Sequence, residues 1–368
     1  GATFNLGDTS FGFVNVGTGN NITSTGGTAT LGNDGVFIYS SDKANLITNS
    51  TKISSIGSSG RNYGIYASGR VENSGDINFG TGLGNLGIYV TNGGIARNTA
   101  TITIGGSDKT NELYGVGMAA GYIGDKTTLP TTGTIQNDGV IKVNGEYSIG
   151  MYGAKTGTTV INNKDIILNA SNTTGIYVEE GAKAKNYGRI ITGVSGLSNV
   201  NGVVLGANST LDNYNRIEIS GTASNGVLLK GGTIGNYGTI IATGAGSRKE
   251  NKLNADPTTK GIGNVKINAP AGATTATITR NGVVVTPTIV NTKARNPINI
   301  SASSIGIYVN TSGKDYTNPI TGLGNLTNEA DLIIGAEATA STTSKHILIN
   351  DNKILDPYNN AILTSGVS

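Results

Sequence analysis

The chain has 368 residues, of which 57 are glycine, 13% are charged and none is cysteine, and its formal net charge is +3. A disordered chain combines low hydrophobicity with high net charge, so this composition excludes one. The lack of cysteine excludes disulfides and thiolate metal sites. Lysine and arginine are scattered rather than clustered, so we expect no nucleic-acid partner. Abundant Gly, Asn, Thr and Ser between short β-branched runs indicate strands and turns rather than helices.

Two short motifs alternate along the chain. The first is Gly-Ile-Tyr-Val or a close variant, and it begins at Gly35, Gly64, Gly87, Gly115, Gly150, Gly175, Gly202, Gly226 and Gly306. The second is Asn-x-Gly-x-Ile, and it begins at Asn49, Asn73, Asn98, Asn137, Asn163, Asn186, Asn213, Asn236 and Asn328. A degenerate coil is also expected at Gly12. Most intervals are 23 to 29 residues, which fits three short strands and is too short for a strand with a crossover helix.

The repeat therefore predicts an all-β fold, a right-handed parallel β-helix (solenoid) of about ten coils with one inserted excursion. Residues 1–246 are predicted to form coils, residues 247–301 an insertion with a β-hairpin, and residues 302–368 further coils. Both ends of the sequence look like mid-repeat sequence, so we expect a piece of a longer chain.

Apolar columns of the stack follow from the alternation of side chains along a strand. The first motif predicts an inward column of Val36, Ile65, Ile88, Val116, Met151, Ile176, Val203, Val227 and Ile307, with a second inward column two residues later. The second motif predicts an inward column of Ile53, Ile77, Ile102, Ile141, Ile167, Ile190, Ile217, Ile240 and Leu332. An aromatic column, which includes Tyr66, Tyr89, Tyr152 and Tyr177, is predicted to face outward.

The asparagine that opens the second motif is expected to form a ladder of amide hydrogen bonds between coils. A sugar-binding or metal-binding ladder is the functional alternative. The glycine two residues later, as at Gly75, Gly139, Gly188 and Gly238, is predicted to adopt a positive φ at a turn.

Two segments depart from the repeat, and function tends to reside in such loops. In residues 247–301, the run 274–286 with Asn281-Gly282 at its centre predicts a β-hairpin with a type I′ turn. This insertion is either a knob that contacts a receptor, or a neutral insertion or disguised coil. Residues 121–134 are expected to form a long turn. The candidate partner-binding residues are Arg248, Lys249, Lys252, Arg280, Asn281, Lys293, Arg295 and Tyr122.

Signals of catalysis are weak. His346 is the only histidine and no Gly-Asp-Ser-Gly protease motif occurs. The carboxylates are dispersed rather than clustered for acid–base work. We therefore predict that the chain is not an enzyme and has no catalytic residues, cofactor or metal site.

The interleaved units, such as Gly175-Ile176-Tyr177-Val178 followed by Asn186-Tyr187-Gly188-Arg189-Ile190, resemble passenger domains of the large type V (monomeric) autotransporters. These are outer-membrane adhesins of Gram-negative bacteria, and very long members from oral anaerobes are the most similar. The resemblance covers nearly all of the chain outside residues 247–301. It implies a secreted protein at the bacterial cell surface, with a signal peptide before this piece and a membrane β-barrel anchor after it.

Our leading hypothesis is a monomeric adhesin fragment that binds a protein or glycan receptor on host cells or other bacteria. One alternative is a polysaccharide-acting β-helix enzyme or tailspike, which requires several carboxylates converging on one face. The other is a structural spacer of a larger surface protein.

Overall fold

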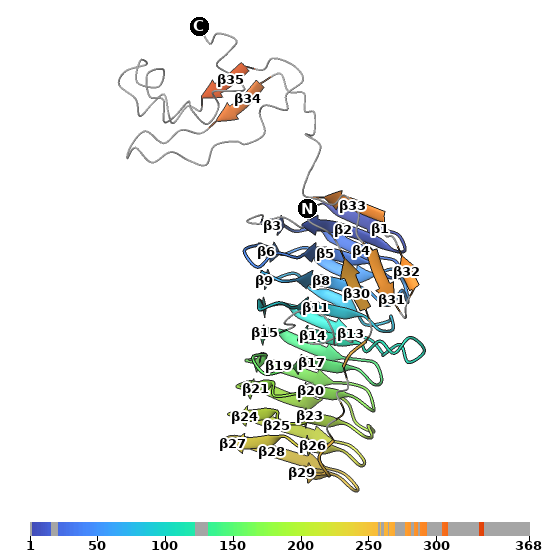
Figure 1. Cartoon of the computed structure of the whole chain (residues 1–368), viewed down its shortest axis with the longest axis vertical. Helices are drawn as coiled ribbons and strands as arrows, with labels where there is room; N and C mark the ends of the chain where they lie inside the picture. Colours follow the sequence, from blue (N-terminus) through green and yellow to red (C-terminus); the bar gives the residue numbers. More distant parts are fainter. Residues whose placement is uncertain are drawn as a thin grey trace, which may run out of the picture. The chain divides into compact units, whose positions relative to one another are not determined.

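The computed structural model describes residues 2–15, 21–121, 132–256, 258 and 261–263, and the backbone of six further strands between residues 265 and 334 (Figure 1). The chain divides into two compact units, Gly1–Lys293 and Ala294–Ser368. In the second unit, β34 (Ser304–Ile307) and β35 (Asp331–Ile334) pair in parallel. The rest of that unit lies outside the described residues, and with it the predicted motif residue Asn328.

The first unit is built from three parallel sheets, here called A, B and C. Sheet A contains β1 (Thr3–Leu6), β4 (Thr28–Leu31), β7 (Lys52–Ser55), β10 (Ile77–Phe79), β13 (Thr101–Ile104), β16 (Val140–Val143), β19 (Asp165–Leu168), β22 (Arg189–Thr192), β25 (Arg216–Ser220) and β28 (Thr239–Thr243). Sheet B contains β2 (Ser10–Asn15), β5 (Val36–Ser40), β8 (Tyr63–Ala67), β11 (Leu86–Val90), β14 (Val116–Ala120), β17 (Ile149–Ala154), β20 (Thr174–Glu179), β23 (Asn201–Leu205), β26 (Asn225–Leu229) and β29 (Arg248–Lys252), with β33 (Thr288–Thr292) beside β2. Sheet C contains β3 (Ile22–Ser24), β6 (Leu46–Asn49), β9 (Arg70–Asn73), β12 (Gly94–Asn98), β15 (Gly133–Asn137), β18 (Thr159–Asn162), β21 (Lys183–Asn186), β24 (Thr210–Asn213) and β27 (Thr233–Asn236).

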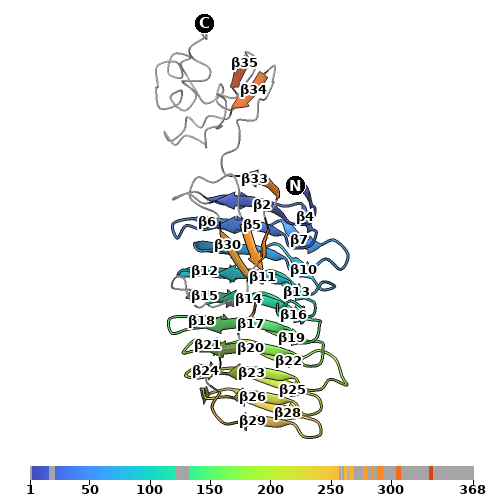
Figure 2. The ribbon, with the colours of Figure 1, turned by 45° about the vertical axis from the view of Figure 1, so that its right-hand side comes forward.

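Successive coils stack because neighbouring strands in each sheet are three elements apart in the chain. The chain passes once through A, B and C in every coil, and the coils lie one under another in both views (Figures 1 and 2). Sheet A has ten strands and sheet C has nine. The predicted all-β parallel β-helix is thus confirmed, and the described residues contain no helix.

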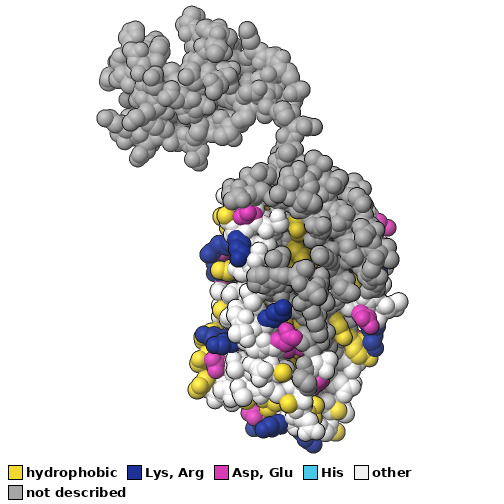
Figure 3. All heavy atoms as spheres, viewed as in Figure 1, with side chains coloured by type: hydrophobic (Ala, Val, Ile, Leu, Met, Phe, Trp, Pro, Cys, Tyr) yellow, Lys and Arg dark blue, Asp and Glu magenta, His cyan; other side chains and the backbone are white. Residues whose placement is uncertain are grey.

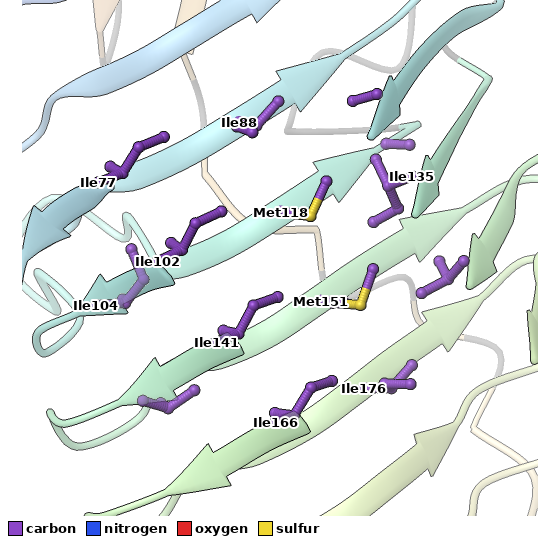
Figure 4. Packing of buried hydrophobic residues seen from close by; sticks show 14 of the residues in the cluster. Ile77, Ile88, Ile102, Ile104, Met118, Ile135, Ile141, Met151, Ile166 and Ile176 are labelled. Carbon is purple, nitrogen blue, oxygen red and sulfur yellow. The ribbon is translucent and has the colours of Figure 1, made fainter. Parts of the chain in front are cut away.

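The interior is filled by aliphatic columns from all three sheets (Figure 4). Sheet A contributes Ile53, Ile77, Ile102, Ile141, Ile166, Ile190, Ile217 and Ile240. Sheet B contributes Ile38, Ile65, Ile88, Met118, Met151, Ile176, Val203 and Val227. Sheet C contributes Ile47, Val71, Ala96, Ile135, Val160, Ala184 and Leu211, a column that we did not predict. Sheets A and B also contribute a second column each, such as Ile104, Val143 and Leu168 in sheet A and Val90, Val178 and Leu205 in sheet B. Burial of each Ile, Leu, Val or Met contributes about 1.5–3 kcal/mol.

Several predicted column members were assigned to the wrong position. Val36 and Val116 do not occupy the inward column, because Ile38 pairs with Ile65 and Met118 with Ile88. We had matched Gly35 and Gly115 to the first glycine of the other Gly-Ile-Tyr-Val motifs. In the structure, Phe37 and Gly117, two residues later, stand level with Gly64 and Gly87.

A one-residue error affects the predicted positions at β18 and β19. The ladder asparagine is Asn162 rather than Asn163, and the inward isoleucine is Ile166 rather than Ile167. Asn162-Asn163 and Ile166-Ile167 are duplicated residues, so the local sequence offers two registers and only the pairing selects one.

The predicted positive φ at the glycines of the second motif was wrong. Gly75, Gly139, Gly188 and Gly238 do not have positive φ values. Instead, a Cβ at Gly188 would overlap the carbonyl oxygen of Lys164 in the preceding coil. Glycine is needed there for close approach of two coils. Positive φ values occur at the turns beside sheet B, as at Asp34 and Asn208.

The asparagine ladder is confirmed. Its members are Asn49, Asn73, Asn98, Asn137, Asn162, Asn186, Asn213 and Asn236. Each Nδ2 donates to the Oδ1 of the next asparagine over 2.8 to 3.2 Å. In most members the same Nδ2 group also donates to a backbone carbonyl, for example Asn162 to Lys164 over 2.9 Å. Because these amides lie at the corner between sheets C and A, they hold that corner in register from coil to coil.

The segment after β29 contains three antiparallel strands. They are β30 (Val265–Asn268), β31 (Thr277–Arg280) and β32 (Val283–Val285). Arg280 pairs with Val283, which is the pairing that the predicted hairpin requires. The two connecting residues lie outside the described part of the chain, so the type I′ turn stays a prediction. Arg248–Lys252, which we placed in the insertion, forms β29 and pairs with β26 of sheet B.

Replacement of Asn162 by alanine tests the ladder. The change removes its hydrogen bonds to Asn137, Asn186 and Lys164 and leaves buried polar groups without partners. We expect the free energy of unfolding to fall by about 3 kcal/mol, measured by urea denaturation. Asn163→Ala, at the exposed neighbour, should cost less than about 1 kcal/mol. Equal losses would contradict a special role for the ladder.

Candidate binding surface

The predicted partner-binding residues fall into two groups. Arg248, Lys249 and Lys252 lie together on β29, the edge strand of sheet B, and are exposed. Arg280 is the last residue of β31, and its side chain is not described. The side chains of Asn281, Lys293, Arg295 and Tyr122 also lie outside the described residues.

The charges of β29 have a structural effect at the end of the stack. Glu250 pairs with Val227, and Lys252 with Leu229, so charged residues occupy positions that are aliphatic in earlier coils. Inward-pointing charges on an edge strand discourage pairing with another strand. The aliphatic column of sheet B therefore ends at β26.

The aromatic column that we predicted to face outward is buried. Tyr89, Tyr152 and Tyr177 do lie on the outer side of sheet B, but they belong to a second hydrophobic cluster and are 0 to 7% exposed, and Tyr66 packs partly buried against that cluster. Phe37, which we also predicted to face outward, lies in the inner core, and Tyr39 takes its place in the outer cluster. Burial raises the pKa of Tyr39 to about 12. These rings cannot contact a partner while they are covered.

The cover is the segment that follows β29, which runs back along sheet B. The amide of Leu253 donates to the carbonyl of Leu229 over 2.9 Å, and the Tyr114 amide donates to the carbonyl of Ile262 over 3.1 Å. Ile262 is 3% exposed and belongs to the outer cluster. Strand β30 lies beside the same sheet in both views, and β33 pairs with β2 (Figures 1 and 2). The described parts of the segment predicted as an excursion thus contact sheet B rather than project from it.

A buried carboxylate anchors this cover. Glu179 is 2% exposed and accepts a hydrogen bond from the Tyr152 hydroxyl over 2.5 Å. Its Oε1 also accepts a hydrogen bond from the amide of Gly261 over 3.0 Å. Burial, and then the charge of Glu179, raise the pKa of Tyr152 well above its usual range. The hydroxyl of Tyr152 thus stays a donor to Glu179.

An exposed row of aromatic rings lies at another corner of the helix. Tyr187, Tyr214 and Tyr237 each directly follow a ladder asparagine, and we call them the tyrosine ladder. Their ring centroids are 4.8 and 5.2 Å apart, with interplanar angles of 3° and 15°. They are 44, 44 and 70% exposed. Our sequence reasoning missed this row, although Asn-Tyr recurs in three successive coils.

The ring of Tyr237 lies beside Gly235 of sheet C. A Cβ built on Gly235 would lie 3.1 Å from Cε2 of Tyr237, two residues later. The strand register aligns Gly235 with Asp212 and Lys185 in the two preceding coils. The outer side of sheet C beside the tyrosine ladder therefore carries both a carboxylate and an ammonium group.

The charges around the tyrosine ladder are partly neutralised by pairing. Arg189 pairs with Asp165 at 2.6 Å, and Arg216 pairs with Glu218 at 2.7 Å. A second set of side chains has no ion pair within the described residues: Lys164, Lys183 and Lys185. Desolvation, and then the charge of Asp212, raise the pKa of Tyr214. Elsewhere, charged and apolar side chains are dispersed over the visible face of the first unit (Figure 3).

Two carboxylates converge on one arginine at the turns between sheets A and B. Arg61 Nε lies 3.0 Å from Asp34 Oδ1, and its Nη1 lies 3.5 Å from Asp108 Oδ2. Burial by itself raises the pKa of Asp108, but hydrogen bonds from Asn111 and the charge of Arg61 outweigh it, so the pKa lies below its ordinary value. The cluster links three coils by charge.

Within the described ranges, no group of three or more His, Cys, Asp or Glu side chains could hold a metal ion. A search of the same residues for a helix with the length and apolarity to cross a membrane found none.

The fold defines the class as a parallel β-helix. Residues 80–189, which include β11 to β21, match the family model of the third pectate lyase-like domain of BigA. This region is less than a third of the chain, so the similarity concerns one part of the helix. It supports a bacterial surface protein with a β-helix. No curated protein and no solved structure matches the chain.

Loosening of the cover should be visible in tyrosine titration. In Ile262→Asp a charge enters the apolar cluster, so the cover should detach and the outer-cluster tyrosines should ionise nearer to the ordinary value of about 10. The expected result is additional phenolate absorbance between about pH 10 and the value of about 12 for Tyr39. Leu253→Asp, at a residue that is 45% exposed, is the control and should titrate like the original chain. If both variants behave alike, Ile262 does not hold the cover.

The Asp34–Arg61–Asp108 cluster predicts a loss of stability in acid. Because the folded pKa of Asp108 is depressed, its contribution is present above the unfolded value of about 3.9 and is lost as the pH falls through the folded value. The urea midpoint should therefore fall between about pH 5 and pH 3, and Asp108→Asn should lower it near pH 5 and flatten this dependence. An unchanged slope in this variant would contradict the assignment.

Proposed function

We propose that this chain is part of a bacterial cell-surface adhesin, a passenger segment of the type V autotransporter kind, and that it acts by binding rather than catalysis. In this proposal its β-helix presents the tyrosine ladder to a receptor on host cells or other bacteria. The similarity of residues 80–189 to a BigA domain supports a surface location. A membrane β-barrel elsewhere in the parent protein would anchor it.

The observation that carries the proposal is the exposed stack of three tyrosine rings. Tyrosine is enriched at binding hot spots because it offers a large, rigid contact area together with a polar hydroxyl. These rings are held by their neighbours and by the asparagine ladder beneath them. Little conformational entropy is then lost on binding, which favours affinity. A pure spacer has no need of three large exposed rings in register.

Dispersed carboxylates support binding over catalysis. Asp34 and Asp108, in the turns between sheets A and B, are both engaged by Arg61. An acid–base pair for sugar cleavage needs one carboxyl with a raised pKa, whereas that of Asp108 is lowered.

Binding to epithelial cells and to other bacteria, measured by flow cytometry with labelled protein, tests the proposal. The variant Tyr187→Ser, Tyr214→Ser, Tyr237→Ser should bind at least about 10-fold more weakly, since loss of a hot spot costs about 2 kcal/mol or more. Tyr147→Ser is the matched control, because Tyr147 is 37% exposed and stacks on no other tyrosine in the described part of the chain.

Absence of binding by the original chain would favour the spacer. Equal binding by the triple variant would place the contact on another surface. Deletion of residues 247–301 is a poor test, because it would remove β29 and expose the apolar cluster on sheet B.

A further inference from the structure

We infer that the tyrosine ladder binds a linear acidic polysaccharide whose sugar units run along the stack of coils. This inference rests on the proposed function and names the chemical class of the ligand. Three features of the described surface support it: the spacing of the rings, the hydroxyl groups that they present, and the unpaired lysines beside them.

The spacing of the rings indicates which class of linear polymer can bind along this row. The centroids are 4.8 and 5.2 Å apart, so a ligand that uses every ring needs a repeat of similar length. An extended peptide advances about 3.3 Å per residue, and its side chains on one face are about 6.6 Å apart. Neither distance matches the spacing of the rings. One pyranose unit of an extended glycan advances by about one ring length, which does match.

The chemistry of the rings also suits sugars. The faces between the rings are covered by the stack, so a glycan along the row meets the ring edges and the phenol groups, with which its hydroxyls can exchange hydrogen bonds. Tyr237, 70% exposed, ends the row, and no further tyrosine stacks on its far side among the described residues. A sugar ring can continue the stack at that point.

Charge decides between a neutral and an acidic glycan. Lys183 and Lys185 lie on β21 directly before Tyr187, and Lys164 lies in the preceding coil. The neighbouring arginines are already paired with Asp165 and Glu218, which leaves three ammonium groups against one carboxylate, Asp212. This excess of positive charge favours a ligand with carboxylate or sulfate groups, and the attraction should weaken with salt.

Titration calorimetry with three probes tests the inference. Hyaluronan carries carboxylates, heparin carries sulfates as well, and a cello-oligosaccharide is neutral. The expected result is binding of at least one acidic probe, little binding of the neutral one, and an affinity that falls at least 10-fold in the triple tyrosine variant. Lys183→Gln with Lys185→Gln should weaken binding and its salt dependence. The matched control is Lys249→Gln with Lys252→Gln on β29, which should bind normally.

Other results would overturn the inference. Equal binding of the neutral probe would refute the acidic class, and equal loss in the β29 control would show unspecific attraction to any lysine. If no probe binds while cells are still bound through the tyrosine ladder, the receptor is not an acidic glycan and the proposed function stands. If cells are not bound either, both fail.

Discussion

Register between coils is the constraint on which the rest of this structure depends, and the asparagine ladder enforces it. Each buried amide of the ladder donates to the amide of the next coil, and most also donate to a backbone carbonyl. A slip of one residue would bury an amide without a hydrogen-bond partner and turn the aliphatic columns outward. Lost hydrogen bonds and lost hydrophobic burial would both disfavour it. Only one alignment of neighbouring coils satisfies both.

This register reaches the surface through the residues that follow the ladder. Tyr187, Tyr214 and Tyr237 stack because the asparagine before each is fixed at the same corner. The interaction that stabilises the interior thus also orders an exposed aromatic row. The same asparagine ladder therefore stabilises the fold and orders the proposed binding surface, without a loop at that surface.

The tyrosines on the outer side of sheet B, by contrast, are buried. Its outer tyrosines would expose a large apolar face if the chain ended at β29. The returning segment around Ile262 removes that face from water, and Glu179 accepts its hydrogen bond inside the apolar surroundings. Covered tyrosines stabilise the first unit, whereas the uncovered row beside sheet C remains available for contact.

The repeated Asn and Gly-Ile-Tyr-Val motifs by themselves determined the fold class, the amide ladder and most of the aliphatic columns, because a stack repeats local patterns at fixed intervals. Tertiary pairing alone chose Asn162 over Asn163 and Ile38 over Val36, since the local sequence is compatible with both registers. It also decided which tyrosines are buried. Tyr177 and Tyr187 both lie on the outer side of their coil. The difference arises because Gly261 and Ile262, 82 residues beyond Glu179 in the case of Gly261, pack over the first ring and not over the second. Long-range covering of this kind leaves no periodic signal in a sequence.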